Sequence, residues 1–151
     1  SDVCSSDLPN IVGVKEASSD PDQIAYVIKD SPEGFRVWSG NDNEILSTMA
    51  VGGYGIVSVA GNIISGQIQK MMGLLLEGDV EAAAAEHLRL LPIFNALFYI
   101  TNPIPIRYAM NRSGFSVGPA RLPMVPEPSE LAAFSARFDP IIDQYAIDLA
   151  D

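Results

Sequence analysis

The stretch Asn10-Ile11-Val12-Gly13-Val14-Lys15-Glu16-Ala17 decides how the rest of the chain is interpreted. Residues 11–15 predict a short strand that is apolar on both faces and ends in a single cation. Removing a lysine ammonium from water is costly, so Lys15 either reaches solvent or has a chemical role. Burial lowers the pKa of a lysine, and a neutral amine can attack a ketone to form a Schiff base. This stretch alone favours the solvent-exposed interpretation, because isolated lysines rarely catalyse, and leaves the Schiff base as the alternative.

Composition predicts a folded domain with a sizeable core. The chain has 151 residues, of which 48% are apolar, and a net charge of -10. The negative charge argues against nucleic acid or an anionic membrane as partner. No apolar run approaches the roughly 20 residues of a membrane-spanning helix. A single cysteine cannot form an internal disulfide, so nothing indicates an oxidising compartment, and we expect a cytoplasmic protein.

The first eight residues, Ser-Asp-Val-Cys-Ser-Ser-Asp-Leu, differ in character from the rest of the chain. They have neither the basic nor the apolar region of a signal peptide. They look like the translated end of a sequencing adapter, so residues 1–8 form a candidate non-native leader in which Cys4 has no functional meaning. On this hypothesis the reading frame was cut here and the chain is a piece of a longer protein. Codons that differ from the adapter would remove the idea.

From Ser18 the chain alternates between predicted helices and strands. The first predicted helix begins at Pro21, is capped by Ser19 or Asp20, and is closed by Pro32 and Gly34. A strand at 35–38 follows, and then a helix that is capped by Asn41 or Asp42 and runs to about Val51. After a turn at 52–55 come a strand at 56–60 and a helix from about Ser65 to Glu77. Strands and helices joined by short connections are typical of parallel β/α units, whose strands are buried on both faces. The working groups of such units lie at the carboxyl ends of the strands. Lys15, residues 39–42 and residues 58–62 all fall there and together predict a site.

The remaining residues predict helices only. The preceding helix is expected to end at Gly78, and the next is expected to begin with Asp79 as its cap and to kink at Pro92. A further helix has Asn102 as its cap, Pro103 as its first residue and Gly114 as its stop. An irregular connector at 119–128 leads to a last helix from Ser129 as its cap to about Leu149. The polar residues of this region receive structural interpretations. His87 has no second histidine or cysteine near it, whereas a zinc site needs about three or four ligands. Asp139, Asp143 and Asp148 predict a solvated helix face, and Met49, Met71, Met72 and Met110 predict core or interface filling.

Five motifs carry a resemblance to a known family. They are Gly13-Val14-Lys15-Glu16-Ala17, Trp38-Ser39-Gly40-Asn41-Asp42, Gly52-Gly53-Tyr54-Gly55-Ile56-Val57-Ser58-Val59, Asn102-Pro103-Ile104-Pro105-Ile106-Arg107 and Arg121-Leu122-Pro123-Met124. In this order and spacing, from Pro9 to near Phe138, they resemble the dihydrodipicolinate synthase family. That family belongs to the class I pyruvate-dependent lyases and aldolases, with N-acetylneuraminate lyase and the 2-keto-3-deoxy sugar acid aldolases.

The resemblance implies an α/β fold, the (β/α)8 TIM barrel followed by an all-helical extension. Residues 9–78 would be the last three β/α units, with barrel strands six, seven and eight at 11–15, 36–38 and 56–60. Residues 79–151 would be the extension, which in the family helps to build a homotetramer, and a homodimer is the alternative.

The resemblance also implies the chemistry. Lys15 matches the lysine that forms an imine with pyruvate, and this covalent imine replaces any metal or other cofactor. In the synthase the derived enamine attacks L-aspartate semialdehyde and yields 4-hydroxy-tetrahydrodipicolinate, on the route to lysine. Gly40 matches a backbone position beside the substrate, and Val57 one whose carbonyl faces it. Asn41 and Asp42 complete the substrate-binding set, with Asn41 at a position where the family commonly has aspartate.

Two alternatives to the synthase remain open. Another pyruvate-dependent aldolase would use the same lysine, although Glu16-Ala17 favours the synthase. A non-catalytic helical interaction module would need no lysine chemistry at all. In the synthases a tyrosine, a threonine pair and an arginine of the active site lie on the first five strands, which are not in this sequence. We therefore expect the chain expressed alone to be inactive and prone to aggregation.

Overall fold

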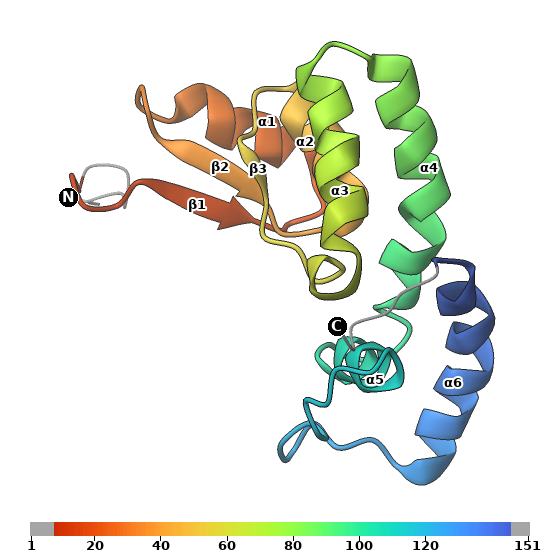
Figure 1. Cartoon of the computed structure of the whole chain (residues 1–151). Coiled ribbons are helices and arrows are strands. Elements are labelled where there is room, and N and C mark those ends of the chain that lie inside the picture. Colours follow the sequence, from red (N-terminus) through yellow and green to blue (C-terminus); the bar gives the residue numbers. More distant parts are fainter. Residues whose placement is uncertain (1–7, 146–151) are drawn as a thin grey trace. The chain divides into compact units, whose positions relative to one another are not determined.

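The computed structural model describes residues 8–145, which divide into two compact units between Ser58 and Val59 (Figure 1). Most of the candidate leader at 1–8, including Cys4, lies outside the described residues. Asp148 and the predicted end of the last helix near Leu149 lie outside them too. The candidate site residues Lys15, Gly40, Asn41, Asp42 and Val57 fall in the first unit, whereas residues 59–62 of the predicted polar cluster belong to the second.

The first unit is built on a parallel three-stranded sheet in the order β1-β2-β3. Its strands are β1 (Gly13–Glu16), β2 (Arg36–Ser39) and β3 (Gly55–Ile56). Lys15 pairs with Trp38, and Trp38 with Gly55, so the carboxyl ends of all three strands meet at one edge of the sheet. This confirms the predicted parallel units. The strand predicted to run to Ala60 is wrong beyond Ile56, because the ladder ends with the hydrogen bond from Val57 N to Ser39 O.

The helices of this unit are α1 (Pro21–Asp30), the 3-10 turn η2 (Asp42–Glu44) and α2 (Ile45–Ala50). The predicted cap of α1 is confirmed, since the Asp20 carboxylate accepts hydrogen bonds from Asp22 N and Gln23 N at 3.0 and 3.2 Å. Of the two predicted caps, Asn41 occupies the cap position of η2, but its side chain makes no capping bond. Its amide instead bonds residues of two loops at the candidate site.

Strand alternation gives the sheet two different faces. Val37 and Ser39 point to the side where α1 and α2 pack, and both are buried there with Ile24 of α1 and Ile45 of α2. Lys15 and its register partner Trp38 alternate onto the other face, where Lys15 is exposed. The strands were predicted to be buried on both faces, but at these positions only the face of Val37 and Ser39 is buried.

The second unit is helical over its described residues. It contains α3 (Gly61–Leu76), α4 (Val80–Ala96), α5 (Ile104–Arg112), α6 (Pro128–Ile142) and the 3-10 turn η3 (Asp143–Tyr145). In Figure 1, α4 runs beside α3, and both helices bury apolar side chains against each other. The largest fully buried side chains of this unit are Met71, Leu90, Ile93, Phe94, Leu97, Phe138 and Ile142.

Several helix ends of this unit follow the local signals. Gly78 has a positive φ of 88°, which favours glycine, and the Asp79 carboxylate caps α4 through Ala82 N at 3.0 Å. α3 begins at Gly61, earlier than expected, but Ile64 leaves the helical region, so the regular part starts near the predicted Ser65. α4 continues through Pro92. The kink expected there stays a prediction.

Two predicted caps in the second unit are wrong. α5 begins at Ile104 with Pro103 in the cap position, one residue later than the assignment of Asn102 as cap. α6 begins at Pro128 with Glu127 as its cap, so Ser129 lies inside the first turn. A proline has a fixed φ and needs no hydrogen bond at its nitrogen, which suits the first position of a helix better than the serine after it.

The aspartates of α6 and η3 are not simply solvated. Asp139 accepts a hydrogen bond from the Tyr108 hydroxyl at 3.0 Å and pairs with Arg112 at 3.2 Å. Arg112 also pairs with Asp143 at 2.7 Å. The prediction of a solvated face is therefore wrong for Asp139, which is half-buried, whereas the Asp143 side chain is 57% exposed, as predicted. Both residues connect the last helical segments to α5.

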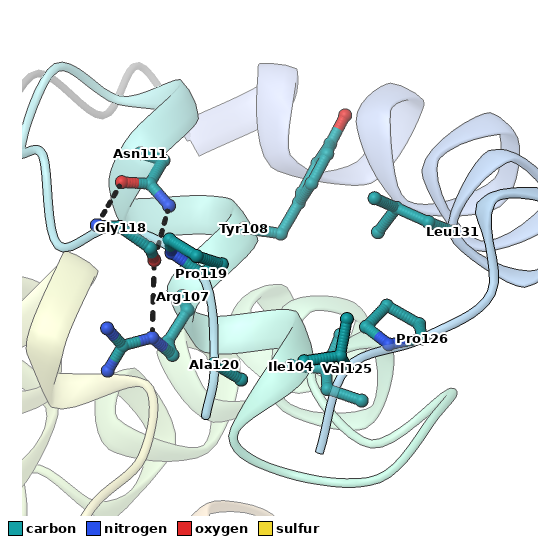
Figure 2. Close-up of a pocket in the computed structure, with 10 residues that line it drawn as sticks. All are labelled: Ile104, Arg107, Tyr108, Asn111, Gly118, Pro119, Ala120, Val125, Pro126 and Leu131. Atoms are coloured by element: carbon teal, nitrogen blue, oxygen red, sulfur yellow. Dashed lines mark hydrogen bonds between the residues drawn. The ribbon is translucent and has the colours of Figure 1, made fainter. Parts of the chain in front are cut away.

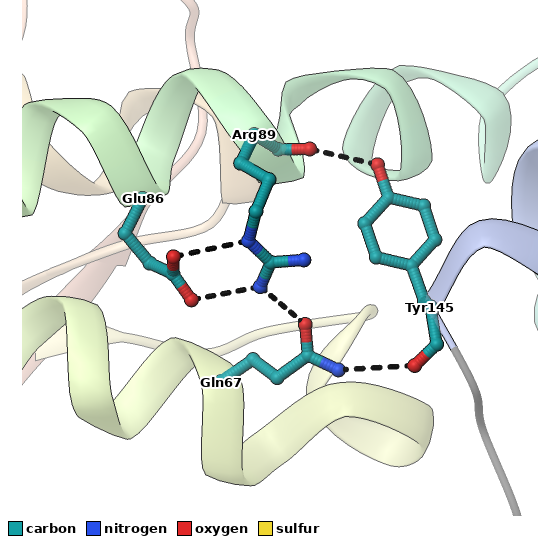
Figure 3. Close-up of polar contacts among 4 residues, drawn as sticks. All are labelled: Gln67, Glu86, Arg89 and Tyr145. Atoms are coloured by element: carbon teal, nitrogen blue, oxygen red, sulfur yellow. Dashed lines mark hydrogen bonds and ion pairs between the residues drawn. The ribbon is translucent and has the colours of Figure 1, made fainter.

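A second polar network ties α3 and α4 to Tyr145 (Figure 3). The Arg89 guanidinium donates to Glu86 at 2.7 Å and to Gln67 Oε1 at 2.6 Å, and the Tyr145 hydroxyl donates to Arg89 O at 2.8 Å. The hydrogen bond from Arg89 lowers the pKa of Glu86, with burial opposing it. The network fixes how these segments pack within the second unit.

Candidate active site

The site residues predicted from sequence lie at the carboxyl ends of the three strands. Lys15 is the third residue of β1, and its side chain is exposed. Gly40 directly follows β2 and is buried, and Val57 directly follows β3. Parallel pairing places these ends next to one another, as expected for a β/α site.

Gly40 lies against the stem of Lys15. A Cβ atom added at Gly40 would be 2.7 Å from Lys15 Cε and 2.5 Å from Ala17 Cβ, distances that real Cβ atoms essentially never show. Its backbone is held in place, because Gly40 N donates to Glu16 O at 2.6 Å. The absence of a side chain at position 40 therefore leaves the space in which the lysine stem runs.

The loop after β2 is shaped by the buried hydroxyl of Ser39. This hydroxyl donates to Asn41 O at 3.0 Å and accepts from Asn41 N at 3.1 Å. The two bonds curl the chain around Gly40, so the loop has a defined conformation without relying on a bound group.

The Asn41 side chain is occupied by two neighbours. Its Nδ2 donates to Ser19 Oγ at 3.0 Å and to Glu44 Oε2 at 2.9 Å. An aspartate at this position would place a second carboxylate against Glu44. The amide therefore suits its surroundings, and it connects the loop after β1 to the loop after β2.

Asp42 has a buried carboxylate, with 2% of the residue exposed. The Ser58 hydroxyl donates a hydrogen bond to Asp42 Oδ1. Ser58 directly follows Val57, whose side chain is 47% exposed and whose N donates to Ser39 O at 2.9 Å. The segments after β2 and β3 are thus joined by both backbone and side-chain contacts.

Sequence reasoning placed Ser39 and Ser58 in polar clusters but gave neither a role, and it used Glu16 only to compare families. Glu16 is buried, and its two carboxylate oxygens accept from Ser18 N at 2.7 Å and Ser18 Oγ at 2.8 Å. The spacing of two residues between Glu16 and Ser18 was a local signal for this turn. The pairing of Ser58 with Asp42 spans sixteen positions and left no signal in the sequence.

His87, the one histidine of the sequence, lies on α4 of the second unit. Burial lowers its pKa, its Nδ1 has no hydrogen-bond partner among the described residues, and its ring centroid lies 6.0 Å from that of Phe94. These contacts support a half-buried structural residue. Within residues 8–145, no three His, Cys, Asp or Glu side chains are grouped closely enough to hold a metal ion.

A cavity of about 310 Å³ lies in the second unit, between α5, the connector after it and α6 (Figure 2). Its walls are mainly apolar, and its polar members are engaged: Arg107 Nε donates to Gly118 O at 3.3 Å, and Asn111 Nδ2 to the same oxygen at 3.1 Å. These contacts give no indication that the cavity has a catalytic role. In the described part of the chain, no helix is both long and apolar enough to cross a membrane.

The chain is similar in sequence and structure to known members of one family. The model of the dihydrodipicolinate synthetase family matches residues 5–135. A 4-hydroxy-tetrahydrodipicolinate synthase of Symbiobacterium thermophilum is 50% identical over 119 residues, which are 79% of this chain and 40% of that protein.

The dihydrodipicolinate synthase structure from Aquifex aeolicus has a TM-score of 0.87 at 32% identity, over 97% of this chain and 49% of that one. The Acinetobacter baumannii enzyme, solved in complex with pyruvate, has a TM-score of 0.79 at 26% identity, over 90% and 47% of the two chains.

The chain spans less than half the length of these relatives. Over that span its α/β units correspond to part of a TIM-barrel-type fold. The family match extends over most of the sequence and includes all three strand ends of the candidate site. The chain belongs to the dihydrodipicolinate synthetase family.

Proposed function

We propose that the protein containing this chain is a Schiff-base lyase that condenses pyruvate with L-aspartate semialdehyde to 4-hydroxy-tetrahydrodipicolinate. The observation that carries the proposal is the placement of Lys15. Its stem runs past Gly40 at the carboxyl ends of parallel strands, and the amine-bearing side chain is exposed. The family match and the name of the Symbiobacterium relative support the same reaction.

In the proposed reaction, Lys15 Nζ attacks the C2 carbonyl of pyruvate, and loss of water gives a cationic imine. The imine withdraws electrons from the neighbouring methyl group, which loses a proton to become an enamine. The enamine carbon forms a bond to the aldehyde carbon of the second substrate, whose C=O π electrons move to oxygen. That oxygen takes up a proton and becomes the 4-hydroxyl group, and the imine to Lys15 forms again. Attack of that substrate's amine on the imine carbon then closes the ring and releases Lys15 for the next turnover. The reaction needs no metal or other cofactor.

We assign substrate binding to the loop and strand ends around Lys15. Gly40 leaves room for the imine, and the carbonyl of Val57 faces the bound keto acid. Asn41 and Asp42 shape the loop after β2 that carries Gly40. Their contacts with Ser19, Glu44 and Ser58 support this assignment.

The proposal includes the architecture expected from the family. Residues 9–78 form the last three units of a (β/α)8 barrel, with β1, β2 and β3 as its sixth, seventh and eighth strands. Residues 79–151 form a helical extension that contributes to a homotetramer or homodimer in the cytoplasm. The three parallel strands followed by helices are consistent with this order.

A hybrid enzyme tests the reaction. In it, this chain replaces the aligned segment of the Symbiobacterium thermophilum relative, which itself serves as positive control. With pyruvate present, we expect the highest kcat/KM for L-aspartate semialdehyde among the aldehydes assayed. Lys15→Arg keeps the positive charge without a nucleophilic amine and should lower kcat by at least about a thousandfold.

A folded hybrid that reacts only with hydroxylated sugar aldehydes or with N-acetylmannosamine would contradict the synthase proposal. It would favour a sugar acid aldolase or an N-acetylneuraminate lyase. A folded hybrid in which Lys15→Arg is as active as the parent would contradict the Schiff-base mechanism itself.

A further inference from the structure

A side-chain hydrogen bond joins the segments after β2 and β3. Ser58 Oγ donates to Asp42 Oδ1, and Asp42 is 2% exposed. Withdrawing a carboxylate from water is unfavourable unless hydrogen bonds replace the lost hydration. The contact with Ser58 therefore helps to keep the Asp42 carboxylate in this position.

The same contact fixes the peptide unit between Val57 and Ser58. On one side of this unit, Val57 N donates to Ser39 O at 2.9 Å. On the other side, the Ser58 side chain is held by Asp42. With both sides anchored, the direction of the Val57 carbonyl is fixed relative to β2.

Asp42 lies in the loop that also carries Gly40. Gly40 is tied to β1 through its hydrogen bond to Glu16 O at 2.6 Å, one residue beyond Lys15. Two hydrogen bonds, linked by the backbone of residues 40–42, therefore connect the segment after β3 to the end of β1. Removing the Ser58 to Asp42 hydrogen bond would weaken one end of this connection.

We propose that Asp42 and Ser58 are positioning residues for binding a small 2-keto acid. Their contact holds the Val57 carbonyl and the Gly40 loop in register with Lys15, and neither side chain reacts. This inference rests on the proposed function. It predicts that losing the contact weakens keto acid binding and leaves the intrinsic reactivity of the Lys15 amine intact.

Borohydride trapping in the hybrid enzyme separates these two effects. The initial rate of reduced adduct formation at Lys15 is measured against pyruvate concentration. For Ser58→Ala we expect the half-saturating pyruvate concentration to rise about tenfold, the size of effect typical for losing one hydrogen bond to a charged group. The maximal trapping rate should stay within about twofold. Ser58→Thr keeps the hydroxyl and should restore half-saturation to within about twofold of the parent.

Asp42→Asn and two control variants distinguish positioning from a loss of stability. Asp42→Asn keeps an acceptor oxygen but loses the charge, so its half-saturation should fall between those of the parent and Ser58→Ala. Ser47→Ala removes a hydroxyl that bonds Glu44 O at 2.9 Å. Ile24→Val loosens the core of the same unit. Neither control should change half-saturation, and Ile24→Val should lower the free energy of unfolding by about 0.5–1.5 kcal/mol.

An unchanged half-saturation in Ser58→Ala, with the parent hybrid labelled at Lys15, would overturn the positioning role and leave the proposed function standing. The role is also overturned if Ile24→Val raises half-saturation as much as Ser58→Ala. Absence of Lys15 labelling in the folded parent hybrid would contradict the proposed function and this inference together.

Discussion

Lys15 and Gly40 come from neighbouring strands and depend on each other's geometry. The lysine stem occupies the volume that a side chain at position 40 would need. In parallel β/α units, a strand-end position with no side chain leaves space beside a reactive group of the next strand. The reach of Lys15 towards a substrate is therefore set by a residue that contributes only backbone.

Gly40→Ala tests this dependence. The added methyl would meet Lys15 Cε and Ala17 Cβ, so either the lysine stem or the loop must shift. We expect the hybrid enzyme to lose at least about tenfold in the rate of Lys15 trapping by pyruvate and borohydride. Gly66→Ala is the matched control, because nothing lies within 4 Å of its added methyl. Equal trapping rates in the two variants would show that Gly40 does not shape the site.

At this scale the sequence predicted the backbone positions better than the side-chain partners. The motif around Lys15 and the three strand ends could be located because parallel pairing follows from the pattern of elements. The partners of Asn41 and Asp42 could not, because Ser19 and Ser58 lie far from them along the chain and meet them only after folding. For the same reason, the cap position of Asn41 could be predicted but the bond of its amide to Ser19 could not.

Among the elements, those with local boundary signals were predicted best. Asp20 with Pro21 and Gly78 with Asp79 mark helix ends through contacts within about four residues, and both are present in the structure. β3 is shorter than its apolar run, since Val57 makes the last ladder bond and the chain then turns towards α3. The pairing of Asp139 with Arg112 and Tyr108 depends on how α5 and α6 pack, which no local pattern specifies.

The helix α4 carries a pH-dependent contribution to stability. Burial lowers the pKa of His87 below its ordinary value of 6.5, so the unfolded chain holds the proton more tightly than the folded one. The contribution is therefore fully present above pH 6.5 and is lost as the pH falls from there towards the lower pKa of the folded state. The pKa of Glu86 is lowered from 4.5, so its contribution to the free energy of unfolding changes only at more acidic pH.

Urea unfolding of the hybrid enzyme between about pH 5 and 7 measures the His87 contribution. We expect the free energy of unfolding to rise with pH across this range, and to rise less steeply in His87→Gln, which cannot take up a proton. Parallel pH profiles for the two proteins would show that His87 titrates alike in the folded and unfolded states.

For the molecule as a whole, the described sheet ends at two strand edges, β1 and β3. Apolar side chains near it are exposed, with Val12 at 66% and Tyr54 at 54%. Unpaired edges and exposed apolar surface promote association between chains. The family's relatives are more than twice as long as the span that this chain covers. In those relatives, residues outside that span can cover the strand edges and the apolar side chains that are exposed here.

We expect the 151-residue chain expressed by itself to associate with increasing concentration and to show no condensation of pyruvate with aldehydes. Light scattering and size-exclusion chromatography measure the association, and Val12→Lys should reduce it, because an edge lysine opposes strand addition. A monodisperse preparation of the chain that catalyses the condensation would contradict this expectation.

The central claim is that Lys15 forms the imine with pyruvate, and the chain has only three lysines, Lys15, Lys29 and Lys70. Lys29 and Lys70 are exposed and lie outside the candidate site, so they serve as internal controls within one protein. The most direct measurement is borohydride reduction of the hybrid enzyme with pyruvate, followed by peptide mass mapping. We predict an adduct on Lys15 with Lys29 and Lys70 unmodified. A folded hybrid with no adduct on Lys15, or with equal labelling of all three lysines, would contradict the claim.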